Sequence, residues 1–531
     1  MWVFIGIIAA LAALVYFYVK KIFSFWSKRN VPQSDVWTCV VDIQKTVFSS
    51  MNFFDFWEQF HTRTKNYRFF GGYQFTTPAL FLRDPELIKT MLVKDFEHFP
   101  NHRDFAEPDA DPIWCRGLFA LKGEKWRAMR ATLSPSFTGS KMKAMFTLID
   151  KAAKDYVDFY KAGPSQFTME CKDSFTRLSN DIIATCAFGI QVNSLKDPNN
   201  EIYLAAKSAF NFGGVLIILK FMLSESCTFF KKMLKQPIFS ENTRKVFSNV
   251  ITDTLKLREE QNIIRPDMIH LLMEARKGLL KHEDENESTP NDTFSMLEPS
   301  QIDRNEKLRL TELTDLDIIA QAMLFVAGGF ETVATTLSLL AYELAVNVHV
   351  QNRLREEIKE CFEKHNNQFN YNAILGMQYM DMVVSESLRK WPTNNMIDRV
   401  CAKTYEIPHN VEDYNEPKVT LHPGNVVILN VYGMHRDPSI YPEPEKFDPE
   451  RFNNENKHKI TPYNYMPFGV GPRHCIAIKF ALMEMKTILA HLLLNYELYP
   501  VEKTHIPMKL EKSSIFMAKG GYWLGLKRVE Y

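Results

Sequence analysis

Apolar residues recur every three or four positions along most of the chain, the spacing of an amphipathic α-helix. The pattern predicts helices over Leu354–Phe362 and Ala481–Leu494, among others. Strand-like stretches are few, and we expect strands only over Tyr73–Leu82, Val426–Asn430 and Gly521–Lys527. The sequence therefore predicts a mainly α protein, a large helical domain with small β-sheets.

One predicted helix, Thr314–Asn347, is longer and more apolar than the others. Its first residue and Asp317 form a capping pair. The uncharged run Ile318–Phe330 that follows has only 13 residues before Glu331, whereas a membrane span needs about 20. We therefore expect a buried central helix. The pair Gly328-Gly329 costs about 1 kcal/mol per glycine relative to alanine, which indicates close approach of another group or a local opening of the helix.

The N-terminal segment is different, because its first 19 residues carry no charge and Lys20 and Lys21 follow at once. About 20 apolar residues span a bilayer. A cleaved signal peptide is the alternative, but its basic residues should precede the apolar run. The basic residues after the run place the rest of the chain in the cytosol. We expect a transmembrane anchor over 1–19, a basic, proline-containing linker over 20–35, and a single globular domain over 36–531.

Composition narrows the class of protein only slightly. The formal net charge of +1 gives no argument for nucleic acid. The eight cysteines are scattered without a C-x-x-C pair, which is typical of a reduced, cytosol-facing protein. The 40 phenylalanines suit an apolar cavity or a large core equally well. The polar, acidic stretch Lys281–Asn305 is interpreted as an exposed loop inside the domain.

Candidate chemistry concentrates in Phe468-Gly-Val-Gly-Pro-Arg-His-Cys475-Ile-Ala477, directly before a predicted helix. A cysteine at a helix N-terminus, two residues past an arginine, lies in a positive potential that favours the thiolate. A thiolate is the ligand that pushes electron density onto a haem iron. The glycines let the backbone approach a flat macrocycle closely. A buried structural cysteine after a glycine-rich turn would show the same local pattern, so other motifs must decide.

This stretch resembles the cytochrome P-450 signature Phe-x-x-Gly-x-Arg-x-Cys-x-Gly and departs from it only at Ala477. Further matches occur in the order the superfamily has them: Trp126-x-x-x-Arg130, Gly328-Gly-Phe-Glu331-Thr332, Glu386-Ser-Leu-Arg389 and Phe447-Asp-Pro-Glu-Arg451-Phe452. The chain is thereby identified as a member of the superfamily. Ser-Glu-Ser-Leu-Arg-Lys-Trp-Pro followed by Asp-Arg-Val-Cys looks most like the insect microsomal members of its ninth family.

The resemblance implies the cytochrome P-450 fold and a haem b whose iron takes Cys475 as axial ligand. It also implies that Phe468 lies beside the cofactor. In the family, Glu386, Arg389 and Arg451 would form a structural triad that holds the cysteine loop. The expected partners of the haem propionates are Arg103, Trp126, Arg130, Arg399 and Arg473.

Glu331 and Thr332 are the expected catalytic pair, because Gly328-Gly-Phe-Glu331-Thr332 resembles the family's oxygen-activation motif. Splitting dioxygen consumes protons, which the acid can relay while the alcohol donates a hydrogen bond. A helix distortion at Gly329 would make room for dioxygen. Val333 replaces a second hydroxyl residue of the motif. A solvated helix face would be the plainer interpretation, and the flanking apolar residues argue against it.

The substrate pocket is expected, by resemblance, to draw on Phe105–Phe119, Phe210–Met222, Phe325–Phe330, Thr393–Ile397 and Ser513–Phe516. Most of these residues are apolar, which fits a lipophilic small molecule: a xenobiotic such as a plant toxin or insecticide, a hormone or another endogenous lipid. We hypothesise that the polar Asn394-Asn395 pair orients a polar substituent. The expected substrate contacts are Phe119, Phe325, Gly329, Asn394, Asn395 and Ile515.

Electrons must come from a partner, since no flavin or nicotinamide motif is visible in the sequence. A run of seven basic residues, opposed only by Glu124, surrounds the Trp126 helix and would steer an acidic reductase. The resemblance implies NADPH-cytochrome P-450 reductase, with cytochrome b5 as a second donor, at the endoplasmic reticulum membrane with the domain facing the cytosol. A lipid-hydroperoxide isomerase or dehydratase, or a non-enzymatic haem or gas sensor, are the rival functions. The basic residues are Arg116, Lys122, Lys125, Arg127, Arg130, Lys141 and Lys143.

Overall fold

Helices account for most of the computed structural model, which describes residues 2–47, 51–74, 76–209, 220, 233–265, 267–279, 310, 313–409 and 416–529. The predicted loop Lys281–Asn305 lies outside the described residues, as does the expected pocket segment Phe210–Met222 apart from Lys220. The helices are α1 (Trp2–Ile22), α2 (Val36–Val47), α3 (Phe53–Arg63), α4 (Pro85–Lys89), α5 (Pro112–Arg116), α6 (Gly123–Leu133), α7 (Gly139–Lys161), α8 (Cys171–Ile183), α9 (Glu201–Ala209), α12 (Glu241–Gln261), α13 (Met268–Arg276), α15 (Asp315–Val346), α16 (Val348–Lys364), α17 (Tyr371–Gly376), α18 (Gln378–Lys390), α19 (Val431–Met434) and α20 (Ile478–Asn495).

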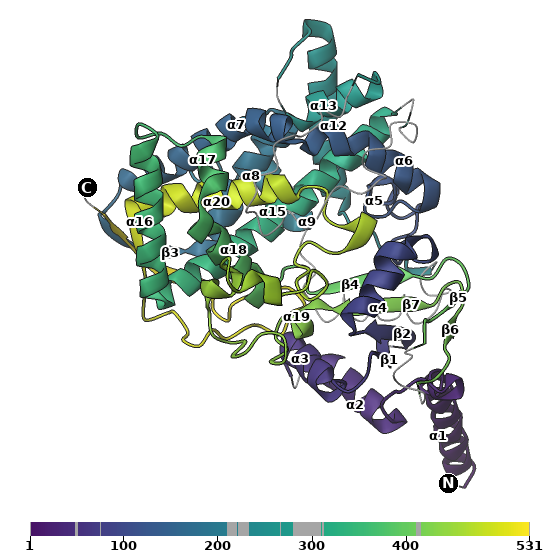
Figure 1. The fold of residues 1–531 in the computed structure, drawn as a ribbon. Helices are drawn as coiled ribbons and strands as arrows, with labels where there is room; N and C mark the ends of the chain where they lie inside the picture. The colour runs from purple at the N-terminus through teal and green to yellow at the C-terminus, as the bar shows by residue number, and fades with distance from the viewer. Residues whose placement is uncertain are drawn as a thin grey trace.

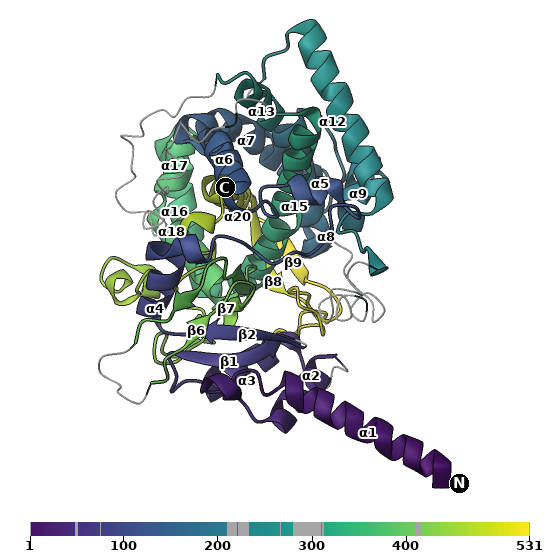
Figure 2. The ribbon, with the colours of Figure 1, turned by 90° about the vertical axis from the view of Figure 1, so that its right-hand side faces the viewer.

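Helix α15 runs through the middle of the helical part and packs against α5, α8, α12, α18 and α20 (Figures 1 and 2). Thr314 and Asp317 form the predicted capping box at its start. By length and composition α15 could cross a membrane, yet 61% of its most apolar window is buried inside the protein. The prediction of a buried central helix is confirmed. The expected distortion at Gly329 is wrong, because the helix is uninterrupted from Asp315 to Val346.

A four-stranded sheet lies beside the helical part, with strand order β1-β2-β7-β4 (Figure 2). Its strands are β1 (Phe69–Gln74), β2 (Thr77–Leu82), β7 (Val426–Asn430) and β4 (Met396–Val400). The prediction for β7 is confirmed. The single strand predicted over Tyr73–Leu82 is wrong, because Gln74 pairs with Thr77 and the chain reverses there into an antiparallel hairpin. Apolar residues on both sides of the turn conceal it in the sequence.

A second sheet has three strands in the order β3-β9-β8. It consists of β3 (Gln166–Glu170), β9 (Trp523–Arg528) and β8 (Tyr496–Pro500), so the strand predicted near the C-terminus is present and begins two residues later than expected. A short pair, β5 (Tyr405–Glu406) and β6 (Thr420–Leu421), completes the described strands.

Helix α1 projects away from the rest of the molecule (Figures 1 and 2). The chain beyond it is not a free linker, in contrast to the prediction for 20–35. Phe23, Trp26 and Val31 are buried, and Trp26 is fully so. Its indole Nε1 donates to the carbonyl of Gly72 in β1 over 2.9 Å. Trp26 therefore fixes the segment to the four-stranded sheet, and the segment belongs to the folded domain. No local sequence pattern reveals this contact.

Two clusters of buried apolar side chains meet at the loop that carries Cys475. One surrounds α15 and includes Ile478 and Phe480 at the start of α20. The other lies on the four-stranded sheet and includes Met466 and Val470. The cysteine loop thus bridges the helical part and the sheet, and packing fixes it from both ends.

Candidate active site around Cys475

The cysteine loop is a tight reversal that only glycine permits at one point. Gly471 has φ of +68°, and a Cβ there would lie 2.2 Å from the Leu92 carbonyl oxygen. The N–H of Cys475 donates to the Phe468 carbonyl over 2.8 Å and closes the loop. Helix α20 begins three residues after Cys475. The expected position before a helix N-terminus is therefore present.

The side chain of Cys475 is accessible although the residue lies within the fold. Burial raises the pKa of the Cys475 thiol, while the backbone N–H of Ala477 and the charge of Arg130 lower it. We expected the surroundings to favour the thiolate, but these two groups only partly offset desolvation. A coordinating metal ion deprotonates a thiol outright, so the remaining stabilisation must come from a bound metal.

Helix α6 attaches to the cysteine loop through the residues of the Trp126-x-x-x-Arg130 motif. Both side chains are buried and lie one turn apart on the same face. Arg130 donates from Nη1 to the His474 carbonyl over 2.9 Å. The guanidinium carbon of Arg473 lies 4.0 Å from the centre of the Trp126 ring, a cation–π contact. The motif predicts that Trp126 and Arg130 share one helix face, and the structure shows that they do.

Arg473 and Arg399 bring further positive charge to this region. Arg473 donates from Nε to the Pro100 carbonyl over 2.8 Å and from Nη2 to the Leu121 carbonyl over 2.6 Å. Burial, then repulsion by Arg399 and Arg130, lowers the pKa of Arg473 to about 8. Burial lowers the pKa of Arg399 to about 10 against the attraction of Asp398. Such depressed values mean that the cationic groups lack sufficient negative charge nearby.

Asp398 is the carboxylate that faces these arginines, and it is already engaged. It accepts from the backbone N–H of Arg103 over 2.8 Å, and its other oxygen lies 3.1 Å from His102 Nδ1. Burial opposes ionisation of Asp398, but the contacts with His102 and Arg103 hold its pKa well below the ordinary value. The Arg103 side chain is thus drawn to Asp398 as well, at 3.4 Å.

The residues present fit a haem with two carboxylate groups. Two buried arginines, Arg130 and Arg399, and the half-buried Arg473 lie at the cysteine loop, and Arg399 Nε is buried with no hydrogen-bond partner in the described part of the chain. Propionate groups would supply the missing negative charge, since a buried cation requires a partner. The accessible sulfur of Cys475 supplies an axial ligand of the kind haem enzymes use.

One face of α15 is accessible in the middle of an otherwise buried helix. Gly328 and Thr332 are exposed, whereas Val333 and the residues after it are buried. The Thr332 hydroxyl donates to the Gly328 carbonyl one turn back. A Cβ on Gly328 would meet nothing within 4 Å, but a Cβ on Gly329 would lie 2.4 Å from Ile183 of α8. We expected Gly329 to face the pocket. The structure places open space at Gly328 instead, and Gly329 serves helix packing.

Glu331 points to a partner that sequence reasoning missed. Its Oε1 lies 2.7 Å from the Nζ of Lys172 in the first turn of α8. The same ammonium donates to the Thr335 hydroxyl over 2.6 Å. Burial lowers the pKa of Lys172, and the charge of Glu331 opposes that shift. No local pattern signals this contact, because the two residues are 159 positions apart.

Glu386, Arg389 and Arg451 come together behind the cysteine loop as expected. Arg389 donates to Glu386 through Nε and Nη2 over 2.7 and 2.9 Å, and Arg451 Nε lies 3.4 Å from the same carboxylate. His435 continues the connection and was missed in the sequence. Arg389 donates to its carbonyl, and its Nε2 accepts from the N–H of Met466 over 3.0 Å, just before the cysteine loop.

The neutral state of His435 follows from its surroundings. It is fully buried, and burial with repulsion by Arg389 lowers its pKa to about 3. Because Nε2 must accept from a backbone N–H, the proton lies on Nδ1, which contacts the Arg389 carbonyl oxygen at 3.2 Å. The triad and the cysteine loop are thus linked through one uncharged imidazole.

The expected substrate contacts differ in how firmly they are held. Phe119 is 37% exposed and stacks on His102, and Phe325 of α15 packs edge-on against Phe137. The exposed amide of Asn394 lies 3.8 Å from the Cβ position of Gly469 in the cysteine loop. Asn395 instead donates to the Ser514 carbonyl over 3.0 Å, next to the half-buried Ile515. Of the two asparagines, Asn394 is therefore the one adjoining the cysteine loop.

The basic run around α6 is less positive than its sequence suggests. Carboxylates remote in sequence pair with four of its members, and Arg130 is buried. Lys125 and Lys143 are exposed. The expectation that only Glu124 opposes the basic run is therefore wrong, because carboxylates from other segments also pair with it in the folded protein. The ion pairs are Arg116–Asp317, Lys122–Asp104, Arg127–Glu97 and Lys141–Glu274.

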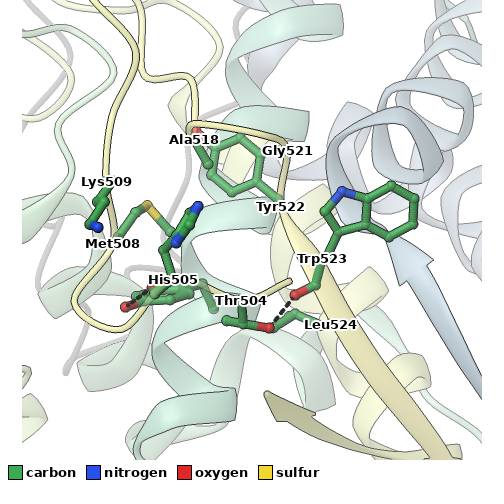
Figure 3. A pocket seen from close by; sticks show the side chains of 10 residues that line it. Thr504, His505, Met508, Lys509, Ala518, Gly521, Tyr522, Trp523 and Leu524 are labelled. Atoms are coloured by element: carbon green, nitrogen blue, oxygen red, sulfur yellow. Dashed lines mark hydrogen bonds between the residues drawn. The ribbon is translucent and has the colours of Figure 1, made fainter. Parts of the chain in front are cut away.

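A small cavity next to β9 is not a ligand site (Figure 3). Its volume is about 10 Å³, which is room for a single water molecule. At its edge, Thr504 donates to the Trp523 carbonyl over 2.6 Å (Figure 3). Tyr342 of α15 donates to the His505 carbonyl over 3.2 Å. The cavity lies in the packing between α15 and the three-stranded sheet.

Comparison with known proteins agrees with this geometry. A family model described as cytochrome P450 matches residues 32–525. The chain is 40% identical to cytochrome P450 9e2 of Blattella germanica, over 99% of this chain and 98% of the relative. It is 38% identical to the probable cytochrome P450 9f2 of Drosophila melanogaster, over 99% of both, and 34% identical to cytochrome P450 6k1 of Blattella germanica, over 96% and 94%. The chain therefore belongs to the cytochrome P450 family of haem-thiolate monooxygenases and is similar to insect members of its ninth family.

Proposed function

We propose that this cytochrome P450 is a membrane-anchored monooxygenase that takes electrons from a flavoprotein reductase and inserts one oxygen atom of O₂ into lipophilic small molecules. The observation that carries the proposal is the accessible face of α15, where Thr332 and Gly328 are exposed on a buried helix. Next to it, Glu331 supplies a carboxyl group. An acid beside an accessible alcohol suits proton delivery into an apolar site.

Cys475 would hold the haem iron, and Trp126, Arg103, Arg130, Arg399 and Arg473 would face the propionates, with Phe468 beside the ring. When bound, the haem supplies the activation of dioxygen. The buried triad of Glu386, Arg389 and Arg451 would keep the cysteine loop in place. Arg130 contacts the loop at the His474 carbonyl, and Trp126 contacts it at Arg473. Arg389 and Arg451 both bind Glu386 behind the loop.

In the proposed mechanism, Thr332 and Glu331 divide the handling of protons. The Thr332 hydroxyl, which donates to the Gly328 carbonyl at rest, is free to rotate toward a bound substrate or water. Glu331 would carry protons from solvent to that face of α15. The apolar side chains around them, including Phe325 and Phe330, exclude bulk water.

Helix α1 supports the membrane part of the proposal. Its 21 residues rise about 1.5 Å each, enough to span the hydrocarbon core of a bilayer. Its apolar side chains, among them Trp2, Phe4 and Leu14, are exposed. Lys20 and Lys21 at its end favour a cytosolic catalytic domain. The endoplasmic reticulum membrane is the proposed location, as the resemblance to insect microsomal members implies.

The exposed lysines near α6 are the proposed contact for an acidic reductase. Lys125 and Lys143 are the members of the basic run best suited to the test, since Arg127 is paired with Glu97 and Glu124. Charge reversal at both lysines should slow reduction by added reductase several-fold at low salt and less at high salt. Equal reduction rates at all salt concentrations would dismiss this contact. Cytochrome b5 is the second candidate donor for the same face.

The substrate class rests on the apolar side chains expected around the pocket, and xenobiotics such as plant toxins or insecticides are the proposed substrates. Hormones or other endogenous lipids share the same chemistry. A panel of compounds of matched size with and without a polar substituent, scored by binding-induced change of the haem spectrum, separates these possibilities.

One experiment tests the proposal against its rivals. The purified full chain is reduced under carbon monoxide, its Soret band is recorded, and NADPH consumption is measured with added reductase and a coumarin ether as probe. We expect the long-wavelength band of thiolate ligation and product formation that depends on the reductase. Turnover of a lipid hydroperoxide without reductase would favour an isomerase or dehydratase, and absence of both activities would favour a haem or gas sensor.

A further inference from the structure

Lys172 is placed where a lysine is electrostatically unfavourable. It is the second residue of α8, and the positive end of a helix macrodipole disfavours a cation in the first turn. Its side chain is only 19% exposed. Burial lowers the pKa of Lys172 further. A cation retained under these conditions must be compensated by a specific partner.

The partner is the Glu331 carboxylate on α15. Lys172 Nζ lies 2.7 Å from Glu331 Oε1 and 3.4 Å from the Glu331 carbonyl, and it donates to the Thr335 hydroxyl over 2.6 Å. Thr335 also lies 3.4 Å from Glu331 Oε1. Glu331 and Thr335 are one turn apart, so the ammonium clamps one face of α15. Thr332 is on another face, where its hydroxyl bonds to Gly328.

Glu170 is the other carboxylate whose charge acts on Lys172, and it also opposes the lowering of the Lys172 pKa. Glu170 accepts from the backbone N–H groups of Asp173 and Tyr522, so its two oxygens cap α8 and hold the segment before β9. Burial raises the pKa values of Tyr203 on α9 and of Tyr522 well above the ordinary value, so both phenols remain neutral. Within the described residues, Lys172 is thus the cation in contact with Glu331.

We propose that Lys172 is a positioning residue for Glu331: its ammonium holds the carboxylate on the α8 side of α15 until the carboxylate takes up a proton from solvent and carries it toward Thr332. The inference rests on the proposed role of Glu331. In the step, an O–H bond of a hydronium ion in solvent breaks and an O–H bond forms on Glu331 Oε1, which leaves water and a neutral carboxylic acid beside the ammonium. Lys172 keeps its proton, and no electrons are exchanged.

Neutralisation also releases the clamp. The ion pair loses its mutual attraction once the carboxylate is neutralised. The carboxylic acid can then rotate away from α8 and donate its proton on the Thr332 side. Both groups keep about a fifth of their side-chain surface exposed, 19% for Lys172 and 20% for Glu331, so solvent reaches the pair.

The test compares Lys172→Met and Lys172→Gln with Lys172→Arg, which keeps a charge, and with Lys207→Met. Lys207 is the matched control, because it pairs with Asp173 in the same neighbourhood at 3.6 Å but is 59% exposed. Each full-length, haem-loaded variant is assayed with reductase and a coumarin ether for product formed per NADPH. Lys172→Gln preserves a hydrogen bond and volume, so it answers the question if Lys172→Met does not fold.

We expect Lys172→Met and Lys172→Gln to lower product per NADPH on the order of tenfold, less than the roughly 100-fold attributed to loss of a general acid itself. The solvent isotope effect on turnover should rise, while substrate binding, Lys172→Arg and Lys207→Met stay near wild type. As a readout independent of turnover, the carboxyl band of infrared difference spectra should titrate at higher pH in Lys172→Met than in wild type, because a neighbouring cation is removed, and it should disappear when Glu331→Gln is added.

The outcomes separate the two proposals. Wild-type yields in Lys172→Met and Lys172→Gln, with a lowered yield in Glu331→Gln, would overturn the role of Lys172 and leave that of Glu331 standing. A wild-type yield in Glu331→Gln would overturn the proposed relay itself. A lowered yield in Lys207→Met equal to that of Lys172→Met would reduce the effect to general surface charge and also overturn the inference.

Discussion

The cysteine loop and the accessible face of α15 are held in opposite ways. Around the loop, Arg130, Arg389 and Arg473 each donate to backbone carbonyls of other segments, so the charges bind the fold together. On α15, the Thr332 hydroxyl bonds only within its own helix, and Gly328 faces open space. The first region is fixed by buried charge and the second is left adjustable. Substitutions should therefore cost stability at the loop and turnover on the helix.

The largest effect is expected for Glu386→Gln. The substitution leaves Arg389 and Arg451 buried without their carboxylate, which costs about 3–5 kcal/mol of unfolding free energy. The denaturation midpoint and the fraction of protein with the thiolate Soret band report it. Glu450→Gln is the control, since its ion pair with Arg353 is exposed and such pairs contribute about 1 kcal/mol at most. Similar losses in both variants would contradict the division.

Glu484 on α20 is the exception within the stable region. It is fully buried, and the Ser179 hydroxyl, close to its carboxyl group but outside hydrogen-bond geometry, is the polar side chain that acts on it. Burial raises the pKa of Glu484 to about 8, and Ser179 opposes the shift only in part. The folded state thus binds a proton that the unfolded state, with its ordinary value, releases.

The sign of the pH dependence follows. Stability from Glu484 is fully present below the unfolded pKa, is lost as pH rises from there to about 8, and is constant above that value. The loss is ~1.4 kcal/mol per pH unit. Glu484→Gln should therefore gain stability over wild type as pH rises through this window, in urea denaturation at several pH values. A pH-independent difference between the two proteins would refute the buried neutral carboxyl.

Thr332→Ala should act on turnover and leave the fold intact. Removing the hydroxyl should lower product per NADPH roughly tenfold, which is less than the roughly 100-fold attributed to loss of a proton-transfer group. The thermal midpoint should change little, because the hydroxyl bonds only within its helix. Thr336→Ala, one turn on, removes a buried hydroxyl bonded to the Thr332 carbonyl and serves as control. A loss of yield in the control equal to that in Thr332→Ala would point to helix geometry instead.

The smallest effects should separate Asn394 from Asn395. Asn394→Ala should change product ratios a few-fold and leave stability within about 0.5 kcal/mol, as for an exposed site. Asn395→Ala removes the donor to the Ser514 carbonyl, which should cost about 1 kcal/mol. Product ratios for a polar probe and thermal midpoints are measured on both. Unchanged ratios in Asn394→Ala would end the hypothesis that this amide orients a substituent.

Local sequence patterns predicted those helices and strands that depend on neighbouring residues alone. The capping pair and the apolar run predict α15, and the continuous β-branched and apolar run predicts β7. The hairpin between β1 and β2 was not predicted, because the residues at the reversal, Gln74 to Thr77, include no glycine, proline, asparagine or aspartate that would indicate a turn. The docking of residues 20–35 also escaped, since the burial of Trp26 depends on Gly71 and Gly72 in a strand far along the chain.

The site divides in the same manner. Motif residues such as Cys475, Arg130 and Glu386 could be named from spacing and resemblance, and the structure brings them together. Lys172 and His435 could not be named, because only tertiary contacts join them to Glu331 and to the loop. Gly329 was assigned to the pocket and Gly328 was not, since sequence does not tell which side of a helix a neighbouring helix covers.

The burial of Trp26 determines how the enzyme would sit at a lipid surface. Helix α1 ends at Ile22, and Phe23 and Trp26 directly after it are buried, so almost no slack separates a spanning helix from the folded domain. Under the proposed anchoring, a change in the tilt of α1 would rotate the whole catalytic domain relative to the membrane. Bilayers of different thickness change helix tilt. Membrane thickness would then set the angle at which the catalytic domain leans over the lipid.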